Sequence, residues 1–508
     1  MASAHTEVER KYDVADDAEL PPLDGFPGVE RVDTGPEELE ATYFDTADLD
    51  LAAAAITLRR RTGGADAGWH VKLPGGGHER VELHLPLHKS VKAPPKAFRE
   101  AVRVHTRGRP LKPVATVRTH RTVHRLLDEN ARVLAMVCDD RVTAHTPPPK
   151  DSGLMTAWRE WEVELDEGSA DLLDAADEYL REAGAAASAS ASKLARVLGD
   201  RVQPAPAPKA RHRLRDPAAK VVHARLLEQL TEMKHQDPRV REDLPEAVHD
   251  MRVAMRRLRS ALATFRPLFD RAVTEPLREE LKWVGAVLGE ARDSEVIHQR
   301  LADQVAQEPV ELLLGPVVAR IDSEMGKAYR EAHDRSVEAM RSERYFRLVD
   351  QLDALVADPP WTPVAQEPAH EVLPRRMRND WKRMRTRVAA AEAAPSPEEC
   401  DVRLHDVRKA AKRARYAAEA LTPLYGADAR KFAKAAKSIQ TVLGDHQDSV
   451  VTEQVLRRLG VKAHMAGENG FSFGRLHGLE QARADRTRGE FEEAWSQASR
   501  RKIRRWFT

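Results

Sequence analysis

Two kinds of hydrophobic periodicity divide this chain. Before about residue 200, apolar and polar positions alternate in the segments TEVERKYDV, AITLRRRT, WHVKLP, HERVELHLPL, PVATVRTHRTVHRLL, ARVLAMVCDD and WREWEVELD. Segments in which apolar and polar residues alternate, separated by Gly, Pro and Asp, are typical of antiparallel strands. Residues 169–182 have helical spacing instead. Beyond residue 213 the pattern becomes long and helical, rich in Ala, Leu, Arg and Glu.

A proline-rich spacer separates the two patterns. QPAPAPKARHR begins at Gln203, and alternating proline stiffens an exposed segment while blocking helix and sheet. We therefore expect two domains, residues 1–202 and 213–508, joined by a linker at residues 203–212. The expected fold class is a multidomain chain, with an all-β or α+β domain followed by an all-α one.

The helical half contains an internal repeat. AVHDMRVAMRRLRSAL surrounds His249, and RLHDVRKAAKRARYAAEAL surrounds His405. KWVGAVLGEARDSEV from Lys282 is answered by KSIQTVLGDHQDSVV from Lys437. The two matches are 156 and 155 residues apart. This nearly constant offset predicts a duplicated helical unit.

Charged residues share one face of several expected strands. The groups with this spacing are Glu7, Glu9 and Lys11; Arg59 and Arg61; and Glu160, Glu162 and Glu164. Side chains two residues apart in a strand point the same way. Carboxylates bind Mg²⁺ or Mn²⁺ through oxygen, while Arg and Lys bind phosphate oxygens. Acids and bases together indicate the inside of a barrel that binds a metal with a triphosphate.

The order of the motifs resembles the CYTH family of triphosphate tunnel enzymes. The motifs are EVERKY, YFDT, LRRR, WHVKLP, HERVE, VRTHRTVHRL, DDRV, EWEVEL and SK, over about residues 5–200. The resemblance implies an eight-stranded antiparallel β-barrel, a tunnel that hydrolyses inorganic triphosphate (tripolyphosphate) or a related triphosphate. It also implies Mg²⁺ or Mn²⁺ as the cofactor.

The same resemblance assigns roles to individual residues. The metal-binding carboxylates it implies are Glu7, Glu9, either Asp139 or Asp140, and two or more of Glu160, Glu162 and Glu164. The phosphate-binding bases it implies are Lys11, Arg59, Arg61, Lys72, Arg118 or Arg121, and Lys193. Glu7, Glu9 and Lys11 are the expected catalytic residues, and Arg60 is assigned to the outside.

A stripe of basic residues occurs once in each helical repeat. The first consists of His249, Arg252, Arg256 and Arg259, and the second of His405, Arg408, Lys412 and Arg415. Intervals of three and four residues place each set within an arc of about 80° on a helix. Neighbouring cations repel one another unless anions lie nearby. The repeated stripe therefore predicts a polyanion-binding surface.

These repeats resemble the CHAD family, the conserved histidine α-helical domain, over about residues 213–508. The resemblance implies two pseudo-symmetric helical bundles and a basic channel between them that binds inorganic polyphosphate. The channel residues it implies are His249, Arg252, Arg256, Arg259, Lys282, His405, Arg408, Lys412, Arg415 and Lys437.

Composition narrows the class of partner. The 82 Lys and Arg residues nearly cancel the 81 Asp and Glu residues, and aromatic residues make up only 5%. Nucleic-acid binders usually carry a net basic field and stacking aromatics, so we expect no nucleic-acid partner. No apolar run approaches the ~20 residues of a membrane span, and the first residues are charged where a signal peptide is apolar. We expect a cytoplasmic protein, with polyphosphate granules as a more specific location.

Other functions fit parts of the pattern. A non-catalytic protein of polyphosphate granules would use the same bases, although it has no evident need for two carboxylate triples. An adenylate cyclase or a thiamine triphosphatase would share the tunnel. The sequence does not predict the preferred triphosphate, the preferred metal or the oligomeric state.

Overall fold

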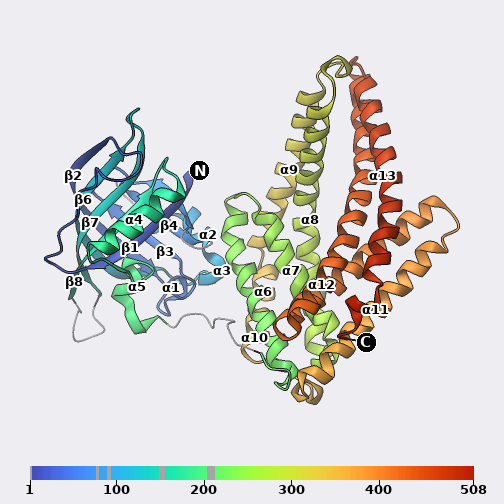
Figure 1. Cartoon of the computed structure of the whole chain (residues 1–508), viewed down its shortest axis with the longest axis horizontal. Coiled ribbons are helices and arrows are strands. Elements are labelled where there is room, and N and C mark those ends of the chain that lie inside the picture. The colour runs from blue at the N-terminus through green and yellow to red at the C-terminus, as the bar shows by residue number, and fades with distance from the viewer. Residues whose placement is uncertain (1–2, 76–78, 88–92, 148–154, 203–211, 508) are drawn as a thin grey trace. The chain divides into compact units, whose positions relative to one another are not determined.

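The computed structural model describes residues 3–75, 79–87, 93–147, 155–202 and 212–507, with only the backbone described at residues 397 and 398 (Figure 1). The chain divides into two compact units, Met1–Ala207 and Pro208–Thr508. Residues 203–211 of the expected linker lie outside the described residues. The boundaries at residues 202 and 213 therefore stay a prediction.

Eight antiparallel strands of the first unit close into a barrel, and a short ninth strand extends it. The strands are β1 (Ser3–Val14), β2 (Arg31–Asp45), β3 (Thr57–Thr62), β4 (Gly68–Pro74), β5 (Glu79–Pro86), β6 (Lys112–Leu127), β7 (Val133–His145), β8 (Met155–Leu165) and β9 (Ala186–Ala187). Their order is β5-β4-β3-β2-β6-β7-β8-β1, and β5 pairs with β1 to close the circle. β9 pairs with the end of β1.

The first unit also contains short helices and one longer helix. They are α1 (Asp50–Ala53), α2 (Lys96–Ala101), α3 (Arg103–Thr106), α4 (Ala170–Glu182) and α5 (Lys193–Leu198). The helix expected at residues 169–182 is confirmed as α4.

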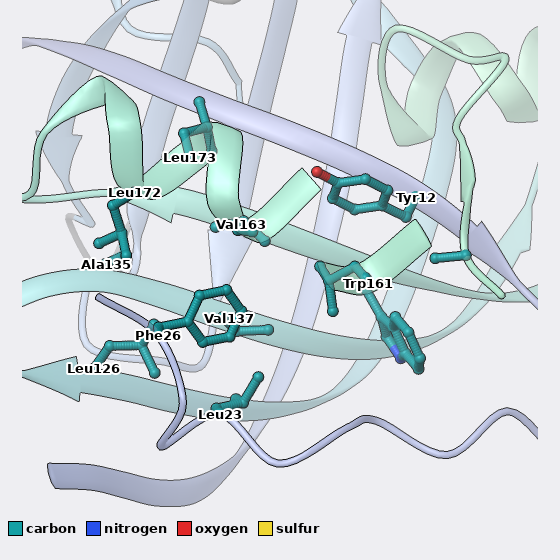
Figure 2. Packing of buried hydrophobic residues seen from close by; sticks show 13 residues of the cluster. Tyr12, Leu23, Phe26, Leu126, Ala135, Val137, Trp161, Val163, Leu172 and Leu173 are labelled. Atoms are coloured by element: carbon teal, nitrogen blue, oxygen red, sulfur yellow. The ribbon is translucent and has the colours of Figure 1, made fainter. Parts of the chain in front are cut away.

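One hydrophobic cluster of the first unit lies outside the barrel, beneath α4. Tyr12, Trp161 and Val163 leave the outer face of β1 and β8 and pack with Leu172 and Leu173 of α4 (Figure 2). Burying one such aliphatic side chain contributes roughly 1.5–3 kcal/mol. Because the strand period is two, placing these apolar residues outside turns the alternate charged residues inward.

One end of the barrel is filled by α5. Leu194 and Leu198 of this helix belong to a buried apolar cluster with Ala41, Tyr43 and Val117 of β2 and β6. Ser192 begins the helix, and its side chain accepts a hydrogen bond from the backbone N–H of Ala195, which is favourable at a helix N-cap. This plug fixes the position of Lys193, the first residue of the helix.

The second unit consists of helices. They are α6 (Ala218–Arg241), α7 (Ala247–Thr264), α8 (Arg271–Gln307), α9 (Val317–Arg341), α10 (Glu343–Ala357), α11 (Ala369–Glu392), α12 (Pro397–Met465), α13 (Phe471–Ala498) and α14 (Arg501–Arg504). α8 with α9, and α12 with α13, form two long hairpins (Figure 1). The hairpins pack through an apolar cluster that includes Leu301, Ile321, Leu456 and Phe473.

The two halves of the second unit are related by pseudo-symmetry. α6 and α11 begin after Pro217 and Pro368, and these two prolines form an antiparallel bridge. α12 is interrupted at Gly426, whose φ of 50° is non-helical. The part of α12 before this glycine corresponds to α7, and the part after it corresponds to α8. The fold class is thus confirmed as a strand barrel followed by two pseudo-symmetric helical bundles. Among the described residues, no helix combines the length and apolar composition that a membrane crossing requires.

Candidate functional site

The inner faces of the strands surround a charged cavity of about 500 Å³. The site residues predicted from the sequence that line this cavity are Glu7, Glu9, Lys11, Arg59, Arg61, Lys72, Arg121, Glu162, Glu164 and Lys193. The register brings the motifs together, because Lys11 of β1 lies opposite Glu162 of β8 and Glu9 lies opposite Glu164. Acids and bases thus share one enclosed space.

Glu162 is the centre of the ionic network in this cavity. Its carboxylate accepts hydrogen bonds from Lys11, from Arg121 Nη2 at 2.6 Å and from Lys193 Nζ at 2.8 Å. Lys11 also donates to Glu9 at 2.6 Å. Burial alone would raise the pKa of Glu162, but the three cations outweigh it and hold that pKa well below its usual range. The glutamate is therefore an anion at neutral pH.

The lysines of the network stay charged for the reciprocal reason. Burial would lower the pKa values of Lys11 and Lys193, yet both are raised because carboxylates surround each ammonium group. At the other side of the cavity, Lys72 donates to Glu7 at 2.5 Å.

Glu164 differs from the other acids. Among the described residues, none forms an ion pair with its carboxylate as the lysines do with Glu162. Burial, followed by the nearby Glu7, raises the pKa of Glu164 to about 7, although Lys72 acts in the opposite direction. This acid therefore titrates close to neutral pH.

Arg61 of β3 lies close to other cations, although it also pairs with Asp66. Burial would lower the pKa of Arg59, on the same face, but Tyr43 and Glu82 outweigh burial and raise that pKa. Burial, followed by the neighbouring Arg59, lowers the pKa of Arg61 to about 9. Arg121 adds to this repulsion. An anion between these guanidinium groups would relieve it, since Arg binds phosphate oxygens through paired hydrogen bonds.

Three carboxylates of β7 and β8 form a buried acidic cluster. Oxygen atoms of Asp140, Glu160 and Glu162 lie within 4.8 Å of one another. Lys193 Nζ lies 2.8 Å from Asp140 and 2.6 Å from Glu160, so its ammonium neutralises part of the cluster. A donor set made only of carboxylate oxygens fits Mg²⁺ or Mn²⁺, which are hard cations.

The structure decides between two pairs of alternatives that the sequence left open, and the reason is the same for both. Arg118 and Asp139 each sit one or three positions from a tunnel residue, so the strand period turns them outward. The side chain of Arg118 is 73% exposed and pairs with Glu40. Asp139 binds Arg159 at 2.7 Å instead. Of the alternatives left open by the sequence, Arg121 and Asp140 face inward, and they pair directly across β6 and β7. Arg60 does not line the cavity.

Strand β5 supplies lining residues that the motifs did not identify. Arg80 and Glu82 face the cavity, and Glu82 accepts a hydrogen bond from His70 Nδ1 at 2.6 Å. The Glu82 carboxylate also lies 3.5 Å from Arg59 and 3.8 Å from Lys72. Alternation in HERVELHLP carried this signal, because Arg80 and Glu82 share a face.

In the second unit, the two basic stripes lie close to each other. The first stripe belongs to α7 and the second to α12. Burial, followed by Arg408, Arg256 and Arg252, lowers the pKa of Lys412 to about 7. The influence of Arg256 and Arg252 shows that cations of both repeats converge.

A matching contact in each repeat positions one arginine. Arg252 donates to the carbonyl of Gly289 at 2.8 Å, and a Cβ on this glycine would lie 3.3 Å from the Arg252 guanidinium. The corresponding pair is Arg408 and Gly444, where a Cβ would lie 2.9 Å from Arg408. The glycines of LGE and LGD thus let a guanidinium approach the helix backbone.

The last arginines of the two stripes have different surroundings. Arg415 donates to Glu419 at 2.6 Å and to Gln440 at 2.9 Å, whereas burial and the cations Arg278 and Arg256 lower the pKa of its counterpart, Arg259. Lys282 is exposed and lies 3.2 Å from Glu279.

The other basic residues of the prediction differ in exposure and pKa. Lys437 is exposed. Burial, followed by nearby cations, lowers the pKa values of His249 and His405.

Comparisons with known proteins agree with this division. The CYTH domain model matches residues 5–198, and the CHAD domain model matches residues 224–457. Uncharacterized proteins from two strains of Mycobacterium tuberculosis are each 40% identical over 502 residues, which cover 96% of this chain and 96% of theirs. The chain therefore belongs to the family of proteins that join a CYTH domain to a CHAD domain.

Solved structures with a similar fold match single units. PptA from Streptomyces chartreusis is 23% identical with a TM-score of 0.46, covering 55% of this chain and 99% of its own. The CHAD domain from the plant Ricinus communis is 27% identical with a TM-score of 0.45, covering 57% of this chain and 95% of its own.

Proposed function

We propose that the barrel hydrolyses inorganic triphosphate, or a related triphosphate, with Mg²⁺ or Mn²⁺, and that the helical unit binds inorganic polyphosphate. CYTH domains are found in triphosphate tunnel hydrolases and cyclases. The observation that carries the proposal is the shared cavity, in which Glu162 contacts Lys11, Arg121 and Lys193. The acids of such a site would hold a metal cation, and its bases would hold the phosphate anion.

The basic and acidic residues of the cavity have different proposed roles. Arg59, Arg61 and Arg121 line the cavity and would bind phosphate oxygens. Repulsion of Arg61 by Arg59 and Arg121 favours an anion beside Arg61. Asp140, Glu160 and Glu162 would hold the metal. A bound Mg²⁺ or Mn²⁺ would supply charge neutralisation and Lewis acidity to the phosphate chain. Charge stabilisation and positioning then account for most of the catalysis.

The test compares substrates on the full chain. We expect phosphate release from tripolyphosphate with Mg²⁺ or Mn²⁺, and its loss in the double variant Glu7→Gln, Glu9→Gln. Glu7 and Glu9 lie outside the acidic cluster of Asp140, Glu160 and Glu162, but they line the cavity and hold Lys72 and Lys11. Release of pyrophosphate from ATP with formation of cyclic AMP would identify a cyclase instead. Polyphosphate binding without hydrolysis of any triphosphate would identify a granule-binding protein.

Polyphosphate binding should depend on pH through Lys412. The pKa of this lysine is lowered to about 7, chiefly by burial and Arg408, and a bound polyanion would raise it. Lys412 is therefore charged without ligand at pH 6 and largely neutral at pH 8, so affinity should fall about tenfold over that interval. Titrations of fluorescent polyphosphate at the two pH values measure the change.

The matched control is Lys412→Arg. Arginine keeps its charge across this range, and it is the residue of the first repeat at the equivalent position, Arg256. The affinity of this variant for polyphosphate should therefore fall less between pH 6 and pH 8 than the affinity of wild type, by about the tenfold assigned to Lys412. An equal pH dependence in both proteins would rule out Lys412 as its source.

Gly444→Ala should weaken polyphosphate binding about threefold to tenfold. The new methyl group would lie 2.9 Å from Arg408 Nη2, so the guanidinium must move, and one charged phosphate contact contributes on the order of 1 kcal/mol. The control is Gly285→Ala on α8, where a Cβ meets nothing within 4 Å and helix propensity favours Ala. Unchanged affinity for Gly444→Ala would contradict the role given to this approach of Arg408 to the helix backbone.

A further inference from the structure

A third stripe of cations runs along α11, outside both sites described above. It consists of Arg375, Arg378, Lys382 and Arg385, with intervals of three, four and three residues as in the stripes of α7 and α12. All four side chains are exposed. The stripe extends over about 15 Å of helix.

The charges of this stripe are not balanced by acids. Across residues 212–507, apart from the side chains at 397 and 398, no carboxylate lies within ion-pair distance of the four cations. α14 brings a further cation to the same face, since Arg504 lies over the Trp381 ring at 4.8 Å. Burial, followed by Arg385, lowers the pKa of Arg504. Like charges brought together without a counter-ion favour a bound anion.

The packing of α14 on α11 is specific. Arg378 Nε donates to the carbonyl of Phe507 at 3.0 Å, and Phe507 is buried against Phe432 and Trp506. The basic turn of α14 is thus held beside the stripe by an apolar anchor.

This stripe does not belong to the duplicated pattern. α6 and α11 have equal lengths of 24 residues and begin after equivalent prolines. At the positions equivalent to the stripe, α6 has Ala224, Leu227, Thr231 and Lys234. The third stripe is therefore a feature of one half alone, and the symmetry of the unit does not explain it.

We propose that the exposed face of α11, with Arg504 of α14, is a second polyanion-binding surface and that its occupant is a long chain of inorganic polyphosphate. This inference rests on the proposed function of the helical unit, to which it adds a second contact region for one ligand. A chain long enough to reach both regions binds more tightly than a short chain, because the second contact is made within the same complex.

The side chains of this face favour polyphosphate over single-stranded nucleic acid. Proteins that bind single strands stack bases on accessible aromatic rings. Trp381, the aromatic residue within the stripe, is only 4% exposed. The other exposed residues between the cations are Asn379 and Arg383. Two further rings near this face, Trp495 and Trp506, are half-buried and already pack on Trp381 or on Tyr425 and Phe507. The described side chains of this surface therefore favour phosphate groups over stacked bases.

The test uses the full chain, one short polyphosphate and one several times longer. The triple variant Arg375→Gln, Lys382→Gln, Arg385→Gln, which keeps the contact of Arg378 with Phe507, should weaken binding of the long chain about tenfold and lower the slope of log affinity against log salt by about two to three. Tight binding of the short chain should stay unchanged. Binding is followed by fluorescence anisotropy over a range of salt concentrations.

A matched control removes three exposed cations from other helices. Lys327, Arg335 and Arg347 pair with acids, and their replacement by Gln should leave long-chain affinity within about twofold. Equal weakening in both triple variants, or no weakening in the α11 variant, would overturn the inference. Competition by single-stranded RNA as effective as that by polyphosphate at equal phosphate concentration would overturn the choice of occupant.

A separate variant tests the proposed polyphosphate channel itself. The variant Arg256→Gln, Lys412→Gln changes only the paired stripes. If it leaves short-chain binding intact, the proposed channel is wrong, whatever happens at α11.

Discussion

Glu162→Gln is expected to lower the rate of tripolyphosphate hydrolysis about 10³-fold, the upper range for loss of one preorganised group. The amide keeps the shape of the carboxylate but not its charge. Lys11, Arg121 and Lys193 would lose the anion they share, and the cluster with Asp140 and Glu160 would lose one charged oxygen. Phosphate release at saturating Mg²⁺ measures the effect.

Two further measurements distinguish this effect from unfolding. Mn²⁺ binding without substrate should weaken in Glu162→Gln, while thermal unfolding remains cooperative. The matched control is Glu38→Gln on β2, because the Glu38 side chain is 75% exposed. Activity above a tenth of wild type together with unchanged Mn²⁺ binding would remove Glu162 from the centre of the site.

Strand period explains why much of the barrel was predictable from the sequence. The alternation of Glu7, Glu9 and Lys11 survives in the structure because β1 is continuous and its alternate residues, such as Tyr12, enter the core under α4. β2 gave no comparable alternating segment. Its pairing with β6 runs through Gly35 and Pro36, residues that usually argue against a strand.

Choices between neighbouring residues needed the register. In DDRV either aspartate could face inward, since one position reverses the face. Pairing of Asp140 with Arg121 across β6 and β7 settles that choice. Asp139 faces outward and accepts a hydrogen bond from Arg159 of the next strand. Because the two residues are far apart in the sequence, no local pattern could reveal this contact.

The helical sites were predictable in spacing but not in environment. Arg259 and Arg415 hold equivalent positions in the two stripes, yet Arg415 is neutralised by Glu419. That difference depends on what packs against each helix. The α11 stripe has the same spacing, and its significance comes from α14, whose position beside Trp381 follows from tertiary packing.

The register also gives a paired prediction on β6. Arg121→Gln is expected to lower kcat/KM for tripolyphosphate about 10²-fold, because the guanidinium faces the cavity and contacts Asp140 and Glu162 at 2.6 Å. Arg118→Gln should stay within about twofold of wild type, since its side chain is 73% exposed and its partner is Glu40. Both variants remove one arginine from the same strand and change the net charge equally. A difference between their activities therefore shows which face of β6 contacts the substrate. Steady-state phosphate release across a range of tripolyphosphate concentrations separates the two. Equal losses in both variants, or a larger loss in Arg118→Gln, would mean that β6 presents its other face to the substrate and that the cavity described here is not the catalytic one.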